Sequence, residues 1–490
     1  MAELARSLEA AFSAHAASPV HRLGASVITY EELDQLSSVV AGFLVKNVPR
    51  GEPVMIVGER EHEFLGFLLG CLKAGNPYVP AGELIPPQRS LAMAGAAGCR
   101  HVLSVDGAAG LPHSAGISIH GPEDFQGHSP HRGWHRCAKG DEIVYILFTS
   151  GSTGVPKGVK VSAGNIESFL SWTSSQFGYC DKPAAFLNQA PFHFDLSVYE
   201  LYNALTTGGS LLSLSGKAAK DPEQLFQRLF EYAPQTEVWV STPSFLRYCA
   251  THPEFSDLAF QKLGQFVLIG EVFSVELARE TRRRFPNARI LNFYGPTEAT
   301  VAHTVFEITP ESLEEADQLP IGLPKPGGSV EIDDGEIVLC GANVAWGYVN
   351  DPAETERKFS ETEGVRRYRT GDLGSLDDRG LLWFRGRVDS QVKVNGFRVE
   401  LGEVERVLGA VPGIGAACVM LESPPGDSPW IVAFVQTTTA EPEIEFRKRL
   451  KATLSDRLPG YMIPKRFVRL GEMPMNQNGK LDRARLRGLL

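Results

Sequence analysis

The chain has 490 residues, enough for two to four domains with a sizeable buried core. Its 48 lysines and arginines and 58 aspartates and glutamates leave a formal charge of −10, which disfavours nonspecific binding to nucleic acid. The N-terminal residues lack the apolar run of a signal peptide, and no stretch of about 18 apolar residues occurs. We therefore expect a cytosolic protein without membrane insertion. The cysteines are scattered singly, which predicts reduced thiols rather than disulfides or a zinc site.

Apolar strand-like runs alternate with helix-like patterns along most of the chain. A strand is expected at residues 53–58 and a helix at 61–75, and the same alternation returns as strand, helix and strand at 266–271, 274–285 and 288–295. This alternation is typical of an α/β fold, in which parallel strands form a sheet and ligands bind beyond the carboxyl ends of the strands.

The pattern of charged and apolar residues changes near residue 385. The segment FRGRVDSQVKVNGFRVELGEVERVL is charged and strand-like before it becomes helical. We place a domain boundary at Arg387 to Asp389. The expected organisation is a large N-terminal domain of residues 1–387 and a small α+β domain of residues 388–490.

The segment LFTSGSTGVPKGVKVS, residues 147–162, is rich in glycine and hydroxyl side chains. Small residues let backbone N–H groups converge, the hydroxyls add donors, and Lys157 adds a positive charge, which together suit phosphate oxygens. The spacing is not that of the P-loop G-x-x-x-x-G-K-[ST], because Lys157 lies between Pro156 and Gly158 and the following residues alternate like a strand. A Gly/Ser hairpin turn without a ligand is the alternative.

Three further polar residues stand in turns where they could serve a nucleotide. Glu298, in NFYGPTEAT, follows an expected parallel strand, and its carboxylate could hold Mg²⁺. Asp372, in YRTGDLG, could accept both hydroxyls of a ribose, and Lys480 lies in MNQNGKLDR near the C-terminus. Each of them, taken alone, is more often an ordinary solvated loop residue.

In their order, these segments resemble the adenylate-forming superfamily, which comprises acyl-CoA and aryl-CoA synthetases, the adenylation domains of nonribosomal peptide synthetases, and firefly luciferases. The resemblance runs nearly end to end and also includes ITYEEL, LKAGNPYVPAG, FHFDLSVYELYNAL, GEIVLCGANVAWGY, GRVDSQVKVNGFRVELGEVE and LPGYMIPKRF. It implies that a carboxylate attacks the α-phosphate of ATP to give an acyl-adenylate and pyrophosphate, and that the acyl group then passes to a thiol.

The resemblance also implies residue roles. Glu298 and Lys480 are expected to be catalytic, with Mg²⁺ on Glu298, because a carboxylate that approaches a polyanion meets a repulsion of ~4 kcal/mol per charge pair at intermediate dielectric. Asp389 is the implied hinge of a mobile C-terminal domain, and Gly396 marks the loop used for thiol transfer. The implied ATP-binding residues are Thr149, Ser150, Gly151, Ser152, Thr153, Gly154, Lys157, Asn292, Tyr294, Gly295, Thr297, Asp372, Phe384 and Arg387.

The segment PFHFDLS indicates which acid is activated. Asp195 resembles the aspartate with which amino-acid-activating members bind the substrate's ammonium group; the alternative is an aspartate that caps the following helix. Tyr199 and Phe293 fill space among the implied pocket residues, which carry no second charge, so a small neutral side chain is expected. The implied pocket residues are Leu196, Tyr199, Val240, Val267, Ile269, Gly270, Phe293, Val301 and Ala302.

Within the superfamily, the sequence motifs of this chain most resemble those of the D-alanine:carrier protein ligases. Where those ligases have a cysteine just before a Gly-Glu pair, this chain has Ile269, which leaves D-alanine, L-alanine and another small apolar or β-amino acid open as substrates. The chain has only 10 residues after Lys480, so we expect a separate carrier protein with a phosphopantetheine thiol as the partner.

Two other functions stay open at this point. A carboxylate:CoA ligase would use the same ATP site but would have no need of Asp195. A non-catalytic nucleotide-binding scaffold is the alternative from another class, and the presence of Lys480, Glu298, Asp372 and the complete loop argues against it.

The first prediction concerns Lys480→Ala. If the ammonium group neutralises charge only during adenylation, the variant loses acyl-adenylate formation but still passes a supplied aminoacyl-adenylate to a carrier thiol. Separate assays of the two half-reactions check this, and a parallel loss of both would contradict the separation of roles.

Overall fold

The computed structural model describes residues 2–82, 85–107, 111, 116–151, 156–216, 221–314, 316–389, 391–394, 396–423, 429–437, 441–474 and 481–490. The predicted site residues Ser152, Thr153, Gly154 and Lys480 lie outside these ranges. Contacts divide the chain into two units. The first comprises residues 1–83, 93–148 and 158–388, and the second comprises residues 84–92, 149–157 and 389–490.

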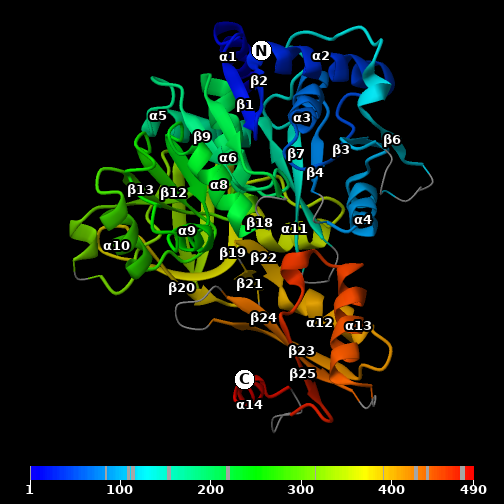
Figure 1. Cartoon of the computed structure of the whole chain (residues 1–490), viewed down its shortest axis with the longest axis vertical. Coiled ribbons are helices and arrows are strands. Elements are labelled where there is room, and N and C mark those ends of the chain that lie inside the picture. Colours follow the sequence, from blue (N-terminus) through cyan, green and yellow to red (C-terminus); the bar gives the residue numbers. More distant parts are fainter. Residues whose placement is uncertain are drawn as a thin grey trace. The chain divides into compact units, whose positions relative to one another are not determined.

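A nine-stranded sheet forms the centre of the first unit (Figure 1). Its strands follow the order β15-β14-β13-β12-β11-β9-β10-β1-β2, and all neighbours from β13 to β1 are parallel. The strands are β1 (Pro19–Leu23), β2 (Ser26–Thr29), β9 (Ala185–Asn188), β10 (Ser210–Ser213), β11 (Val238–Ser241), β12 (Gln265–Leu268), β13 (Arg289–Tyr294), β14 (Thr304–Ile308) and β15 (Leu323–Pro324).

The two faces of this sheet carry separate hydrophobic cores, because side chains alternate along each strand. On β12, Val267 packs on one face, in a core that it shares with α5 (Ala163–Gln176) and α6 (Leu196–Thr207). Phe266 and Leu268 pack on the other. That second core contains side chains of α8 (Pro222–Tyr232), α9 (Pro243–Cys249) and α10 (Val275–Arg284). Both faces are therefore buried, as is usual for parallel strands.

A six-stranded sheet of order β6-β5-β3-β4-β7-β8 is a second layer of this region. Its strands are β3 (Val54–Val57), β4 (Tyr78–Ala81), β5 (His101–Ser104), β6 (Ser118–His120), β7 (Ile143–Thr149) and β8 (Lys157–Ser162). The helices of the N-terminal part are α1 (Glu3–Ala14), α2 (Tyr30–Asn47), α3 (His62–Ala74) and α4 (Pro87–Ala97). Thr29 and Glu32 form a capping box that fixes the start of α2.

A five-stranded antiparallel sheet completes the first unit. It consists of β16 (Gly328–Asp333), β17 (Glu336–Gly341), β18 (Phe359–Thr362), β19 (Val365–Leu376) and β20 (Leu382–Arg387), with α11 (Pro352–Lys358) before β18. In the pair β19 and β20, Asp372 lies opposite Arg387. The register of this hairpin therefore brings two predicted nucleotide-binding residues together.

The second unit has its own core. It contains a hairpin of β21 (Gln391–Val394) and β22 (Phe397–Glu400), and a sheet of β23 (Ala416–Glu422), β24 (Trp430–Gln436) and β25 (Arg466–Leu470). Its helices are α12 (Leu401–Gly409), α13 (Glu443–Ser455) and α14 (Arg483–Arg487). Val404 and Leu408 of α12 pack with Phe446 and Leu450 of α13 and with alternate residues of β24.

The predicted α/β fold is confirmed, and so are the elements on which the prediction rested. The expected strand and helix at 53–75 are β3 and α3, and the expected unit at 266–295 is β12, α10 and β13. Within the described residues, none of the helices combines the length and the apolar character needed to cross a membrane. The seven cysteines are free thiols, as predicted, and all except Cys180 are buried.

Candidate nucleotide and amino-acid site

The turn that follows β13 brings several predicted site residues together. A Cβ atom on Gly295 would lie 2.6 Å from the Cα of Ala302, so only glycine lets the chain fold back this closely. The short helix η2 (Thr297–Ala299) comes next, and Thr300 and Val301 then adopt positive φ angles of 50° and 70°. A β-branched residue such as Val301 rarely takes this conformation, and such strain is found where the surrounding structure holds the backbone firmly.

Asn343 supplies much of that restraint. Its side-chain Nδ2 donates to the carbonyl oxygens of Ala299 at 2.8 Å and of Ala302 at 3.1 Å. In return the Thr300 hydroxyl donates to the Asn343 carbonyl at 2.7 Å. Asn343 is fully buried, and sequence reasoning missed it, because an isolated asparagine after β17 gives no sign of a partner 41 to 44 residues away.

Within this turn, Thr297 contacts Asp195. The Thr297 hydroxyl donates to Asp195 Oδ2 at 2.6 Å. Asp195 directly precedes α6, but its side chain makes no capping hydrogen bond to the first turn of that helix. The capping alternative therefore does not describe how this carboxylate is used.

Tyr145 of β7 is a further group near Asp195 that the sequence did not reveal. Its hydroxyl is buried and has no hydrogen-bond partner among the described residues. The pKa of Tyr145 is raised well above its ordinary value, first by burial, then by Tyr78 and then by the negative charge of Asp195. The half-buried Asp195 carboxylate therefore lies within electrostatic reach of a buried tyrosine hydroxyl.

Glu298 follows Thr297 in the same turn and is fully buried. The Tyr348 hydroxyl donates to Glu298 Oε1 at 2.7 Å, and the Glu298 carbonyl accepts from the N–H of Ala345 at 2.9 Å. Among the described residues, no three His, Cys, Asp or Glu side chains are grouped so as to hold a metal ion. Beside nucleotides, Mg²⁺ is usually held by only one or two carboxylates, and phosphate oxygens and water supply the other ligands. A single carboxylate such as Glu298 is therefore compatible with a magnesium site.

Three of the predicted nucleotide-binding residues form a hydrogen-bonded set. The Tyr294 hydroxyl donates to Asp372 Oδ2 at 2.6 Å, and Arg387 forms an ion pair with Asp372 Oδ1. Burial, followed by the negative charge of Asp372, raises the pKa of Tyr294 well above its ordinary value. Asn292 is also buried, and its side-chain Nδ2 donates to the carbonyl of Pro320 at 3.0 Å.

The residues implied to line the substrate pocket are buried in one hydrophobic core. That core contains Leu196, Tyr199, Val240, Val267, Ile269, Phe293, Val301 and Ala302. The ring of Phe293 is the centre of an aromatic group, with its centroid 5.6 Å from Tyr199, 5.3 Å from Trp172 and 5.5 Å from Phe177. Trp172 and Phe177 were not predicted, since an aromatic residue in an amphipathic helix is normally a core residue. Gly270 follows Ile269 with a φ of 97°, which a side chain would disfavour.

The described part of the predicted phosphate loop belongs to the second unit. The Ser150 hydroxyl donates to the carbonyl of Arg398 at 2.8 Å, and the Thr149 hydroxyl contacts the carbonyl of Lys157 at 3.5 Å. In the same unit Glu403 is buried and pairs with Arg89 at 2.6 Å. Burial raises the pKa of Glu403, although Arg89 and the backbone N–H of Gly151 act in the opposite direction.

The predicted hinge and transfer-loop residues lie in the second unit. The Asp389 carboxylate accepts from the N–H of Gln391 at 3.2 Å. Gly396 has a φ of 85° in the turn between β21 and β22, where glycine is favoured. The predicted ATP-binding residue Phe384 belongs to the first unit instead. It lies on β20 and is half-buried, and its carbonyl accepts from the Gln318 side chain at 2.9 Å.

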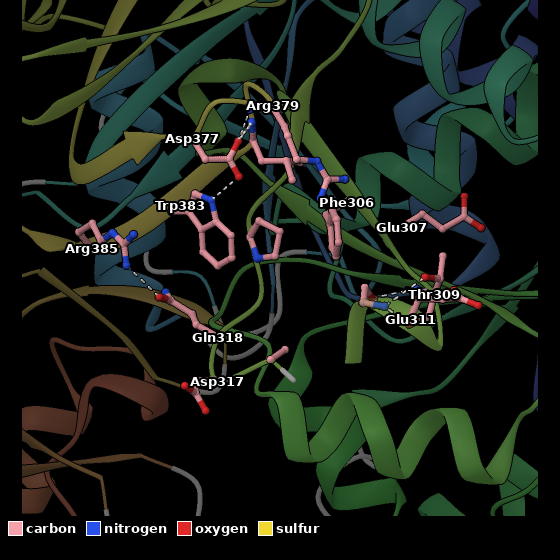
Figure 2. A pocket seen from close by; sticks show the side chains of 14 residues that line it. Phe306, Glu307, Thr309, Glu311, Asp317, Gln318, Asp377, Arg379, Trp383 and Arg385 are labelled. Atoms are coloured by element: carbon pink, nitrogen blue, oxygen red, sulfur yellow. Dashed lines mark hydrogen bonds between the residues drawn. The ribbon is translucent and has the colours of Figure 1, made fainter. Parts of the chain in front are cut away.

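A cleft of about 730 Å³ lies elsewhere in the first unit and contains none of the predicted site residues. Figure 2 shows Trp383 near its centre, with the indole N–H donating to Asp377 at 3.0 Å and Arg385 donating to Gln318 at 3.3 Å. The cleft is lined by backbone segments that also support the site, because Pro320 accepts from Asn292 and Gln318 donates to Phe384.

Comparison with known families accounts for this arrangement. Residues 9–349 match the AMP-binding enzyme model, and residues 403–480 match the AMP-binding enzyme C-terminal domain. The chain belongs to the AMP-binding enzyme family. The predicted membership of the adenylate-forming superfamily is thereby confirmed, as is the prediction of an adenylating ligase, and membership implies the use of ATP.

Relatives of the AMP-binding enzyme cover nearly the whole chain. The D-alanine–D-alanyl carrier protein ligase of Bacillus licheniformis is 36% identical over 475 residues, with 94% of each chain covered. The ligase of the same description from Bacillus mycoides is 37% identical over 480 residues, again with 94% of each covered. Among solved structures, a holo NRPS protein containing adenylation and PCP domains, bound to a vinylsulfonamide inhibitor, superposes with a TM-score of 0.83 at 27% identity. It covers 100% of this chain and 84% of its own.

The second prediction concerns Asn343→Ala. The change leaves the carbonyls of Ala299 and Ala302 without their buried donor, and we expect a loss of about 2 kcal/mol in the free energy of unfolding. We also expect a lower rate of ATP–pyrophosphate exchange per folded molecule, because Thr297 and Glu298 lose their fixed position. Denaturant unfolding and exchange assays on the same preparations measure the two effects.

Asn76→Ala is the matched control. Asn76 is also buried and donates to two carbonyls, those of Pro49 at 2.7 Å and Glu52 at 2.9 Å, but it lies outside the site. We expect the control to lose similar stability and to keep its exchange rate. Equal exchange rates in both variants would contradict a positioning role of Asn343.

Proposed function

We propose that this enzyme activates a small neutral amino acid as its aminoacyl-adenylate and then transfers the aminoacyl group to the phosphopantetheine thiol of a separate carrier protein. Two curated relatives that are 36% and 37% identical are D-alanine–D-alanyl carrier protein ligases, which supports both halves of this proposal. The observation that carries it is the Asp195 carboxylate, which precedes α6 without capping it.

Asp195 would bind the substrate's ammonium group. A carboxylate accepts hydrogen bonds strongly from an ammonium group, and the contact gains strength where water is scarce. Asp195 Oδ2 already accepts from Thr297, which orients the carboxylate. An acid without an amino group could not make this charge-assisted contact, so the contact would favour an amino acid over a simple carboxylic acid.

We also propose roles for the residues of the nucleotide site. Asp372 would hold the ribose hydroxyls, with Tyr294 and Arg387 fixing its orientation. The loop of residues 149–157 would hold the phosphates, and Glu298 would contribute the protein ligand to Mg²⁺, which neutralises phosphate charge when bound. Lys480 would supply a further positive charge during adenylation, and Asp389 and Gly396 would serve as hinge and transfer loop for the second step.

D-alanine is the substrate that we propose first, because it is the one named for the relatives. The apolar lining and the aromatic group around Phe293 fit a small side chain. Ile269 has a larger side chain than the cysteine that D-alanine:carrier protein ligases have at this position, and it would narrow the proposed pocket. L-alanine and small β-amino acids are therefore the alternatives that the experiment has to separate from D-alanine.

Amino-acid-dependent exchange of labelled pyrophosphate into ATP tests the proposal directly. The screen covers D-, L- and β-amino acids and, in parallel, the matching acids without an amino group. We expect exchange with a small neutral amino acid and none with propionate. Exchange that is equally fast with unaminated acids would support the carboxylate:CoA ligase instead, and no exchange with any acid would support a non-catalytic protein.

The third prediction concerns Asp195→Asn, which keeps the shape of the side chain but removes its charge. We expect kcat/KM for the amino acid to fall by roughly 100-fold or more, because a charge-assisted contact is lost, while the affinity for ATP changes little. Asp221→Asn is the control: Asp221 caps α8 through its side chain, and asparagine caps equally well. Unchanged kinetics in Asp195→Asn would exclude Asp195 as the ammonium-binding residue.

The fourth prediction concerns Ile269→Ala, which enlarges the pocket by several apolar groups, each worth about 0.8 kcal/mol of contact. We expect kcat/KM for the native small substrate to fall by roughly ten-fold to a few hundred-fold, and longer apolar amino acids to gain relative to it. Exchange rates across a series of increasing side-chain length measure the shift. The same ranking of substrates in the variant would show that Ile269 does not line the pocket.

A further inference from the structure

A second cavity in the first unit, of about 370 Å³, combines an apolar lining with one lysine and is called the Lys160 cavity below. Its volume lies near the lower end of the range for small-molecule sites, roughly 300 to 1,000 Å³. None of the predicted site residues lines it, so it is separate from the candidate nucleotide and amino-acid site. The apolar side chains of the lining are those of Pro53, Pro77, Ala97, Ile143, Ile146 and Val349.

The ammonium group of Lys160 is the unpaired charge of this lining. Lys160 lies on β8 and is half-buried, and its side chain forms no hydrogen bond or ion pair with the described residues. Burial lowers the pKa of Lys160 below its ordinary value, and no neighbouring charge opposes that shift. The ammonium group has therefore lost part of its hydration without gaining a protein contact in return.

The other two charged residues of the lining neutralise each other. Both Nη atoms of Arg50 donate to the carboxylate of Glu142, each at 2.8 Å, and the N–H of Lys139 donates to the same carboxylate at 2.9 Å. The described lining thus has a net charge of one, carried by Lys160. Because Glu142 is already engaged, the lining offers no unpaired carboxylate to a ligand's ammonium group.

We propose that the Lys160 cavity binds a small monocarboxylate that has an apolar body and no amino group. The carboxylate would accept a charge-assisted hydrogen bond from Lys160, and the apolar body would displace water from the apolar side chains. A phosphate ion would bring more than one charge and no apolar part, and an amino acid would bring an ammonium group without a partner. The proposal does not depend on the proposed function, because it uses none of the same residues.

NMR titration of the full chain with hexanoate tests the proposal. Hexanamide is the matched probe, because it has the same apolar chain but no charge. We expect hexanoate to bind saturably and hexanamide to bind at least about ten-fold more weakly, since a hydrogen bond between charged groups is lost. Inorganic phosphate should fail to displace hexanoate. Absence of saturable hexanoate binding, equal affinity for hexanamide, or displacement by phosphate would each overturn the proposal.

Lys160→Met assigns the binding to this cavity. Methionine keeps the length of the side chain and removes the charge, and the backbone hydrogen bonds of Lys160 with Trp346 and Gly347 do not involve the side chain. We expect hexanoate to bind at least about ten-fold more weakly to this variant. Lys139→Met is the control, because Lys139 is exposed nearby, does not line the cavity and removes the same charge. Unchanged binding in Lys160→Met, or an equal loss in both variants, would overturn the proposal.

Ala97→Leu tests the apolar part of the cavity and leaves Lys160 in place. Ala97 is buried at the end of α4, and a larger side chain there would occupy part of the volume. We expect the variant to lose affinity for hexanoate and to lose less for the shorter propionate. An unchanged affinity for both acids would overturn the assignment to this cavity. Pyrophosphate exchange, measured without hexanoate, reports on the proposed function independently of these outcomes.

Discussion

The close return of the chain after β13 is the constraint on which the candidate site depends. Gly295 permits the backbone to pass within contact distance of Ala302, and the two positive φ angles at Thr300 and Val301 complete the turn. Asn343 offsets the strain by satisfying the carbonyls inside it. A single turn thereby places one side chain against Asp195, the next against Tyr348, and two more in the hydrophobic core that contains the proposed pocket residues.

The parallel sheet supplies the frame for this turn. Strands β9, β11, β12 and β13 run in the same direction, so the segments after them meet at one edge, as the general rule for α/β sheets requires. Asp195, Ile269 and Thr297 come from three of these segments. The sheet therefore brings into contact residues such as Asp195 and Thr297, which are 102 positions apart in the sequence.

The two kinds of contact in the proposed amino-acid subsite differ in how sharply they discriminate. Apolar contacts around Phe293 separate substrates by about 1 to 3 kcal/mol for each methylene group, which gives graded selectivity for size. The charge-assisted contact at Asp195 is lost altogether when the substrate has no ammonium group, which carries a larger penalty than one missing methylene group. We therefore expect an enzyme that is strict about the amino group and more tolerant of the side chain.

Sequence reasoning predicted the fold and named several residues that the structure brings into contact, for physical reasons that differ between residues. The alternation of strand and helix patterns predicted β12, α10 and β13 because periodicity is a local signal. Tyr294, Asp372 and Arg387 lie in segments with a recognisable pattern, and the structure joins them by hydrogen bonds. Asn343 and Trp172 were missed, because their partners are distant in sequence and an isolated asparagine or a helical tryptophan has a commonplace local pattern.

The most direct test of the central claim, that Asp195 recognises an amino group beside a nucleotide site, uses two non-reactive adenylate analogues. One is alanyl-sulfamoyl-adenosine, and the other is its propionyl counterpart, which lacks only the ammonium group. Their dissociation constants are measured by calorimetry with the unmodified protein. We predict that the alanyl analogue binds roughly 100-fold more tightly or better, since the propionyl analogue cannot make the charge-assisted contact with Asp195. Equal affinity for the two analogues would contradict it.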